Sequence, residues 1–397
     1  MKNKSFWLRF LAGGLVVFST PFLVTALIKN PPDMTGVVNA AVKFTDSGIF
    51  TKNEITGLGS GSLILYTPKK PAASEETQTE QTSQQEVTQS TTEERAEQTQ
   101  QILPQTEDVT AEDYLITQNI SEEREDLSVY SNFSGKVSTI TYTANQGANY
   151  LNLPSGAQVR NCTELENDYV KKEMTETPDF KIEAYSDEPQ VLIMHTHTSE
   201  SYLLEGEYYD EEYTSRTSDP NQSVVAVGEH IAVKLAEAGI CTIHDGTVHD
   251  SPYNGAYDRS AETVSAILEK YPSIKVVLDI HRDGIVQSDG TWVSAVCDIN
   301  GKSAAQVMII SAAGGGGYYV PDYIQNFHLA CLLQDSMEAA NPGITRPVLL
   351  DYCQYNQNLS TGSLLIEVGS HGNTLEQALY SGDLIGESIA KALLTLT

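Results

Sequence analysis

The chain has 397 residues and a formal net charge of −29, and 40% of its residues are hydrophobic. That apolar content is sufficient for a folded core, and the length corresponds to about two to three domains. The acidic balance argues against a general nucleic-acid binder, because such proteins need clustered Lys and Arg to neutralise phosphates. It also argues against a protein that a basic patch holds on anionic lipid.

The N-terminus has the pattern of an exported protein. Lys2, Lys4 and Arg9 are the charged residues among the first nine, and residues 10–28 carry no charge. A helix that crosses a bilayer needs about 20 apolar residues, and leading basic residues keep the N-terminus in the cytoplasm. Residues 1–29 are therefore predicted to form a cytoplasmic tip and a transmembrane anchor, with the rest of the chain outside the cell membrane. The alternatives are a cleaved signal peptide, which exports the same body, and a buried helix of a soluble protein.

Three segments separate this anchor from the main domain. Residues 30–70 are moderately apolar and are interpreted as a membrane-proximal stretch. Residues 71–113 are predicted to be a disordered, self-repelling acidic linker, because eleven Asp and Glu face one basic residue, Arg95, between positions 73 and 113. Residues 114–149 are expected to form an extension with short strands, since residues 137–143 alternate as a strand does.

Residues 150–397 alternate apolar strands with amphipathic helices. The predicted strands cover residues 158–160, 191–194, 240–243, 274–280, 305–311 and 363–368. The predicted helices cover residues 223–238, 261–270, 326–339 and 376–395. This alternation predicts an α/β domain with a mostly parallel twisted sheet flanked by helices.

The five cysteines do not have the spacing of a disulfide framework. Free thiols, or at most one or two disulfides, are expected. Cys241, Cys297 and Cys331 lie in apolar surroundings, which favours buried small hydrophobic residues over nucleophiles.

Residues of metal-ligating types follow the predicted strand at residues 191–194. His197 and Glu200 form an H-x-x-E pair that a turn can fold around one ion, and zinc takes imidazole nitrogen and carboxylate oxygen. His195 lies two residues before His197, so in an extended strand both would share a face. His195 is therefore an alternative ligand or a residue that supports the ligands. The competing interpretation is a polar loop with unrelated histidines.

Two further predicted strands carry similar residues. His281 would complete a set of two His and one carboxylate, which leaves a position open for water, and Asp279 or Asp283 could orient its imidazole. Glu367 lies within an apolar strand, where a carboxylate is costly without a task or a partner, and it suits the role of proton acceptor. The competing interpretations are a structural histidine and a Glu buried against an Arg.

The remaining candidates concern substrate binding. His371 lies just beyond the last predicted strand and could contact substrate. Arg259, Arg282 and Arg346 are candidates for docking substrate carboxylates, because guanidinium groups pair with two oxygens at once. A Gly-x-Ser-x-Gly motif is absent from the sequence, so a serine hydrolase of the elbow type has no support.

Three motifs in a fixed order carry a family resemblance. HTHTSESY at residues 195–202, LDIHRD at 278–283 and IEVGSHGNTLEQA at 366–378, behind a basic single-span N-terminus, resemble the stage II sporulation protein P family. These are cell-wall hydrolases of endospore-forming bacteria, and the resemblance covers residues 145–397. It implies a zinc-dependent N-acetylmuramoyl-L-alanine amidase with added endopeptidase activity on peptidoglycan.

The resemblance also implies where and with what the protein acts. It implies action in forespore engulfment, at the sporulation septum, beside a membrane partner and a lytic transglycosylase. It implies the fold of zinc amidases and zinc carboxypeptidases for a catalytic domain at residues 150–397. Within that domain it implies His197, Glu200 and His281 as zinc ligands and Glu367 as the base. A non-catalytic wall-binding or scaffold module and a zinc carboxypeptidase on free peptides are the alternatives.

Overall fold

The computed structural model describes residues 49–55, 62–71 and 134–397, except residues 207 and 211. The predicted anchor, and the predicted linker beyond residue 71, lie outside the described residues. The described residues from Thr51 onward form one compact unit. Among the described residues, no helix is long and apolar enough to span a bilayer.

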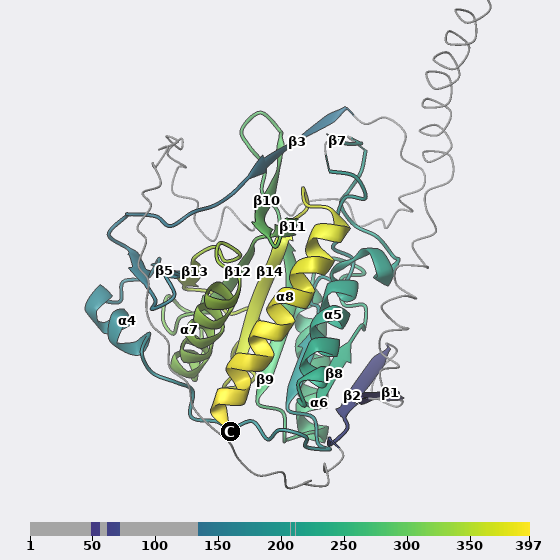
Figure 1. The fold of residues 1–397 in the computed structure, drawn as a ribbon, viewed down its shortest axis with the longest axis vertical. Coiled ribbons are helices and arrows are strands. Elements are labelled where there is room, and N and C mark those ends of the chain that lie inside the picture. Colours follow the sequence, from purple (N-terminus) through teal and green to yellow (C-terminus); the bar gives the residue numbers. More distant parts are fainter. Residues whose placement is uncertain (1–48, 56–61, 72–133, 207, 211) are drawn as a thin grey trace, which may run out of the picture. The chain divides into compact units, whose positions relative to one another are not determined.

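A ten-stranded sheet forms the centre of this unit (Figure 1). Its strands, in spatial order, are β1 (Phe50–Ile55), β2 (Leu63–Pro68), β8 (Thr242–Asp245), β6 (Val191–Met194), β9 (Val276–Asp283), β14 (Ser363–Ser370), β12 (Val307–Ala312), β13 (Val348–Asp351), β5 (Gln158–Asn161) and β4 (Tyr150–Asn152). The middle strands are buried along their whole length, as expected for strands covered on both faces.

A four-stranded sheet lies beside the first, with the order β11 (Lys302–Ala305), β10 (Trp292–Ile299), β3 (Gly135–Ile140) and β7 (Tyr208–Tyr209). Strand β10 pairs antiparallel with β11 and parallel with β3. Segments from three distant parts of the chain therefore meet in this small sheet.

Helices cover both faces of the large sheet. In Figure 1, α5 (Val224–Glu237), α8 (Leu375–Leu393) and α7 (Tyr323–Ala340) lie side by side over one face, and α8 packs between the other two. Helix α6 (Ala256–Lys270) packs through Val264 and Ile267 on a core that includes Leu192 and Met194 of β6. The remaining helical elements are α4 (Asn167–Glu173), η2 (Pro220–Gln222) and η3 (Leu394–Leu396).

The direction of the chain connections reverses at β6, which lies between β8 and β9. The chain passes from β6 through α5 to β8 on one side, and then back through α6 to β9 on the other side of β6. Right-handed crossovers in opposite directions put α5 and α6 on opposite faces of the sheet. Ligand sites of open α/β sheets form at such a reversal, beyond the carboxyl ends of the strands.

The structure confirms the α/β class and refines the sheet. Five of the strand pairs with a defined register are parallel and three are antiparallel, so the sheet is mixed. The central strand β12 runs antiparallel to β14, which alternation of strands and helices alone does not predict. Strand β2, within the stretch interpreted as membrane-proximal, pairs with β8. All five cysteines are free thiols, and Cys241, Cys297 and Cys331 are buried as predicted.

Candidate functional site

The turn after β6 separates the two histidines that the sequence placed on one face. Strand β6 ends at Met194, and residues 196–199 form a turn in which Glu200 N donates to His197 O at 3.1 Å. The side chains of His195 and His197 therefore have different surroundings. The expectation of a shared face was wrong, because the chain leaves the extended conformation before His197.

His195 is packed against α5 and has a partner at each ring nitrogen. Its Nδ1 lies 2.9 Å from Ile280 O, and its Nε2 lies 3.0 Å from His244 Nε2. Burial lowers the pKa of His195 and of His244 to about 3, so both rings are neutral at neutral pH. This arrangement favours a structural role for His195 and leaves His197 as the better-placed ligand candidate.

His281 lies between two carboxylates. Its Nδ1 is 3.4 Å from Glu200 Oε2, and its Nε2 is 2.9 Å from Asp279 Oδ1 in an ion-pair contact that lacks the alignment of a regular hydrogen bond. Burial opposes protonation of the ring, but Asp279 and Glu200 together raise the pKa of His281 well above its usual value. For Glu200, burial also opposes the charge, whereas Arg282 and His281 hold its pKa below the ordinary range.

His197 faces the same point from the turn after β6. Its ring centroid is 5.3 Å from that of His281, and it stacks on Tyr253 at 4.5 Å. The ring of Tyr257 is nearly perpendicular to that of His197, with 5.5 Å between the two ring centroids. Burial lowers the pKa of His197 to about 4, and its Nδ1 is buried without a hydrogen-bond partner. A neutral imidazole with an unpaired buried nitrogen is the state that binds a metal ion.

Glu367 completes the group from β14. It is the Cα partner of His281 across the parallel β14–β9 ladder, and a register shift follows between Glu367 and Ser370. Gly369 has φ 66° within this bulge, and bulges commonly redirect side chains next to active sites. Burial, together with the charges of Asp283 and Glu200, raises the pKa of Glu367 to about 8.

The candidate residues share an unusual number of unsatisfied polar atoms. Buried side-chain atoms without a hydrogen-bond partner include His197 Nδ1, Glu200 Oε1, His281 Nε2, Glu367 Oε2 and His371 Nε2. Each such atom costs about 1–3 kcal/mol unless a bound group satisfies it. Two imidazoles and a carboxylate form the donor set of catalytic zinc sites, so the residues fit zinc chemically. As the side chains stand, no group of three or more His, Cys, Asp or Glu in the described part of the chain is arranged to hold a metal ion, so binding requires side-chain rearrangement.

The candidate arginines have partners within the chain. Arg282 donates to Ser201 O at 3.2 Å and to Ser215 O at 3.0 Å, and its backbone N donates to Glu200 Oε2. Arg259 Nε donates to His249 O at 2.6 Å, which secures the segment that carries Tyr253. Arg346 Nη1 donates to Asp283 Oδ2 at 2.7 Å. The contacts of Arg282 and Arg259 thus hold segments of the candidate site itself. Docking of substrate carboxylates by the three arginines stays a prediction.

His371 lies at the border between the site and the small sheet. Its backbone N donates to Asp283 O at 2.9 Å, and its ring meets that of Trp292 edge to face at 4.1 Å. Burial, with the charge of Arg282, holds its pKa well below the usual value. Asn373 fixes this turn to β10 through a bond to Ala295 O at 3.0 Å. The Nε2 of His371 is buried without a hydrogen-bond partner, and substrate binding by His371 stays a prediction.

Sequence reasoning missed the residues that surround His197. Arg216 donates to Asp250 Oδ2 at 3.0 Å, and its guanidinium lies 4.6 Å from the ring centroid of Tyr253. Tyr253 in turn stacks on His197. These residues could have been found by applying the strand-end rule to β8 as well, because Asp250 and Tyr253 follow that strand.

Two sequence comparisons identify relatives. A model of the family Stage II sporulation protein P (SpoIIP) matches residues 49–390. The Stage II sporulation protein P of Bacillus subtilis (strain 168) is 28% identical over 258 residues, which is 59% of this chain and 61% of that protein. The match therefore spans less than two thirds of the length of that relative.

Solved structures give weaker likenesses. The N-acetylmuramoyl-L-alanine amidase AmiC2 of Nostoc punctiforme is 15% identical, with a TM-score of 0.32 over 52% of this chain and 96% of that one. The CwlD amidase from Clostridioides difficile, in complex with the GerS lipoprotein, gives 15% and 0.32 over 52% and 94%. A metallo-carboxypeptidase from Burkholderia cenocepacia gives 11% and 0.29 over 60% and 71%. TM-scores this low carry no argument about activity. The family model covers most of the described sequence, and the chain belongs to the Stage II sporulation protein P family.

Proposed function

We propose that this chain is a zinc-dependent peptidoglycan hydrolase that cleaves the amide bond between N-acetylmuramic acid and L-alanine. The observation that carries the proposal is the group of unsatisfied buried atoms on His197, Glu200 and Glu367 beside His281. These residues lie on three strand ends that meet at one edge of the sheet. Membership of a sporulation protein family supports peptidoglycan as the substrate.

Each residue has a chemical task in this proposal. His197, Glu200 and His281 would hold zinc, which when bound polarises the amide carbonyl and acidifies a water molecule. Glu367 takes the proton from the attacking water and returns it to the leaving amine. A carboxyl group whose pKa is raised to about 8 is a stronger base than an exposed carboxylate once it is ionised, and a zinc ion bound beside it would favour the ionised form. His371 would contact the substrate.

The biological setting is proposed on the same basis. The expected N-terminal anchor would place the domain outside the cytoplasm, in reach of the wall. The proposal also includes endopeptidase activity on cross-linked stem peptides. It further includes action beside a membrane partner and a lytic transglycosylase during engulfment.

Product analysis tests the reaction. The purified protein is incubated with peptidoglycan, with zinc or with a chelator, and the released material is analysed by mass spectrometry. Free stem peptides and intact glycan, formed in the presence of zinc, are expected. Release of single C-terminal residues would indicate a carboxypeptidase instead, and intact peptidoglycan in all samples would indicate a binding module.

A further inference from the structure

A chain of hydrogen bonds runs from the loop after β13 to Asp279, and Asp279 makes an ion-pair contact with His281. Asn356 Nδ2 donates to Ser260 Oγ at 2.9 Å, and Ser260 Oγ lies 2.9 Å from Thr196 Oγ1. Thr196 Oγ1 donates to Asp279 Oδ2 at 2.7 Å. Asp279 Oδ1 lies 2.9 Å from His281 Nε2. We call Asn356, Ser260, Thr196 and Asp279 the Asp279 network.

The Asp279 carboxylate accepts the hydroxyl proton of Thr196. Thr196 Oγ1 can in turn accept from Ser260, whose hydroxyl also lies 3.2 Å from Tyr257 O as a second acceptor. Asn356 then supplies the proton that Ser260 Oγ accepts. The backbone N of Thr196 adds a bond of 2.8 Å to Asp279 Oδ1. A carboxylate that is 4% exposed, with donors on both oxygens, is held both charged and immobile.

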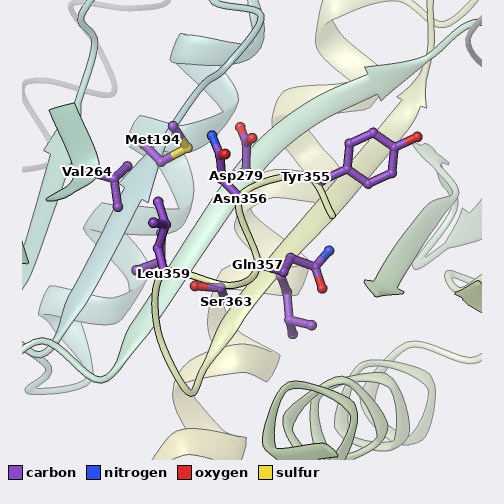
Figure 2. Close-up of a pocket in the computed structure, with 10 residues that line it drawn as sticks. Met194, Val264, Asp279, Tyr355, Asn356, Gln357, Leu359 and Ser363 are labelled. Carbon is purple, nitrogen blue, oxygen red and sulfur yellow. The ribbon is translucent and has the colours of Figure 1, made fainter. Parts of the chain in front are cut away.

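The apolar surroundings of Asp279 strengthen the hydrogen bonds that it accepts. Figure 2 shows Asp279 and Asn356 side by side at one pocket, with Met194, Val264 and Leu359 close by. Apolar walls lower the local dielectric and strengthen hydrogen bonds to a charged group. No step of the proposed reaction uses the Asp279 carboxylate. Its position beside one of the two ring nitrogens of His281 suggests a role in orienting that ring.

Asp279 and Glu200 approach opposite nitrogens of His281. Asp279 lies at Nε2, and Glu200 Oε2 is 3.4 Å from Nδ1. The Nδ1 side of His281 therefore faces Glu200, which is itself a ligand candidate, and the Nε2 side faces Asp279.

We propose that Asp279, held by Thr196, Ser260 and Asn356, is the positioning residue that keeps the proton of His281 on Nε2, so that Nδ1 is the atom that meets the metal ion. The inference rests on the proposed zinc site. Groups that orient a metal-binding imidazole in this way typically change metal affinity about 10- to 100-fold when they are lost.

The far end of the Asp279 network is a conformationally constrained loop. Tyr355 and Asn356 have φ values of 42° and 56°, in the left-handed region. This conformation is tolerable for Asn but unfavourable for a bulky residue such as Tyr, and such strain persists where the surroundings impose it. Asn356 also donates to Tyr257 O at 2.9 Å, so the loop is fastened to α6 where it supports Ser260.

Matched threonine variants test the proposal. Zinc affinity of the metal-free protein is measured by competition with a chromogenic chelator for the wild type, Asp279→Asn, Thr196→Val and the control Thr263→Val. Thr263 Oγ1 bonds His249 Nε2 at 3.0 Å, so its variant also removes a hydroxyl beside a histidine, but one outside the candidate site. We expect zinc to bind about 10-fold or more weakly to the first two variants and equally to the control. Equal affinity in all four proteins would overturn the inference.

Two further measurements keep the test decisive. Ser260→Ala and Asn356→Ala change residues of the Asp279 network that lie farther from His281, and they replace Asp279→Asn or Thr196→Val if either of these fails to fold. Weaker zinc binding in these variants supports the inference, and unchanged zinc binding opposes it. Long-range nitrogen–proton NMR spectra of the zinc-loaded protein report the His281 tautomer, with the proton expected on Nε2. A proton on Nδ1 would contradict the inference, whereas a wild-type protein that binds no zinc would contradict the proposed function itself.

Discussion

Glu367 of β14 and His281 of β9 are Cα partners on neighbouring parallel strands. Partner residues of adjacent strands point to the same face of the sheet, so a proton acceptor and a metal-ligand candidate are adjacent without help from a flexible loop. Glu200 reaches the same ring from the turn after β6. The strands therefore fix the relative position of two of the four candidate groups.

Replacement of the proposed base separates catalysis from metal binding. Glu367→Gln keeps the shape of the side chain but removes its ability to accept a proton. We expect peptidoglycan cleavage to fall about 10²- to 10⁴-fold, with the zinc content unchanged by elemental analysis. Full activity in this variant would contradict the assignment of the base.

Removal of a ligand candidate should change zinc binding as well as activity. His281→Ala should lower the zinc content of the protein as well as its activity. His230→Ala is the control, because His230 contacts Asp383 at 3.0 Å on the α5–α8 side and has no role in the site. Equal zinc content in the two variants would exclude His281 as a ligand.

The buried His195–His244 pair predicts how stability depends on pH. Burial, with a smaller effect of Lys52, lowers the pKa of His244 in the folded protein to about 3, whereas an unfolded histidine has a pKa of about 6.5. A lowered pKa means that the folded state resists protonation, so this contribution is complete above pH 6.5 and is lost as the pH falls toward 3. His244→Gln should make the free energy of unfolding, measured with urea between pH 6 and 4, fall less steeply, by up to about 1.4 kcal/mol per pH unit. An unchanged slope would contradict the lowered pKa.

Gly228 of α5 allows the same histidines to pack against the helix. A Cβ at this position would lie 2.6 Å from the His195 ring and 2.9 Å from His244 Nε2. Gly228→Ala should therefore lower the free energy of unfolding by about 1–3 kcal/mol, despite the better helix propensity of Ala. At the control Gly246→Ala, the nearest atoms are 3.5 Å away, and a much smaller change is expected. Equal stability of both variants would show that the contact relaxes freely.

Much of the fold could be predicted because its core strands are apolar runs. Strand β6 has the predicted bounds, and β9, β12 and β14 overlap the predicted ranges. Strands β10 and β13 were not predicted. Strand β10 forms a hairpin with β11 across Asn300-Gly301, a local signal that the prediction did not use, whereas β13 owes its place in the sheet to β12 and β5, which are distant in sequence. Short strands that depend on distant partners have no strong local signal.

The candidate site was predicted to the level of residue types at strand ends. Side-chain direction was not predictable, because it depends on where an element stops. The side chains of His195 and His197 point in different directions because β6 ends at Met194. The guanidinium group of Arg282 donates to the backbone oxygens of Ser201 and Ser215 within the protein. The contacts of Thr196 and Asn356 required the folded structure, since more than a hundred residues of chain separate them.

In the proposed function, zinc at His197, Glu200 and His281 serves peptidoglycan cleavage by this chain. The most direct measurement titrates zinc into the metal-free protein and records bound zinc and the rate of amide cleavage in the same samples. We predict that the rate rises in proportion to bound zinc and reaches its maximum at one ion per chain. Cleavage by the metal-free protein at the same rate, or one ion bound per chain with no cleavage, would contradict the account.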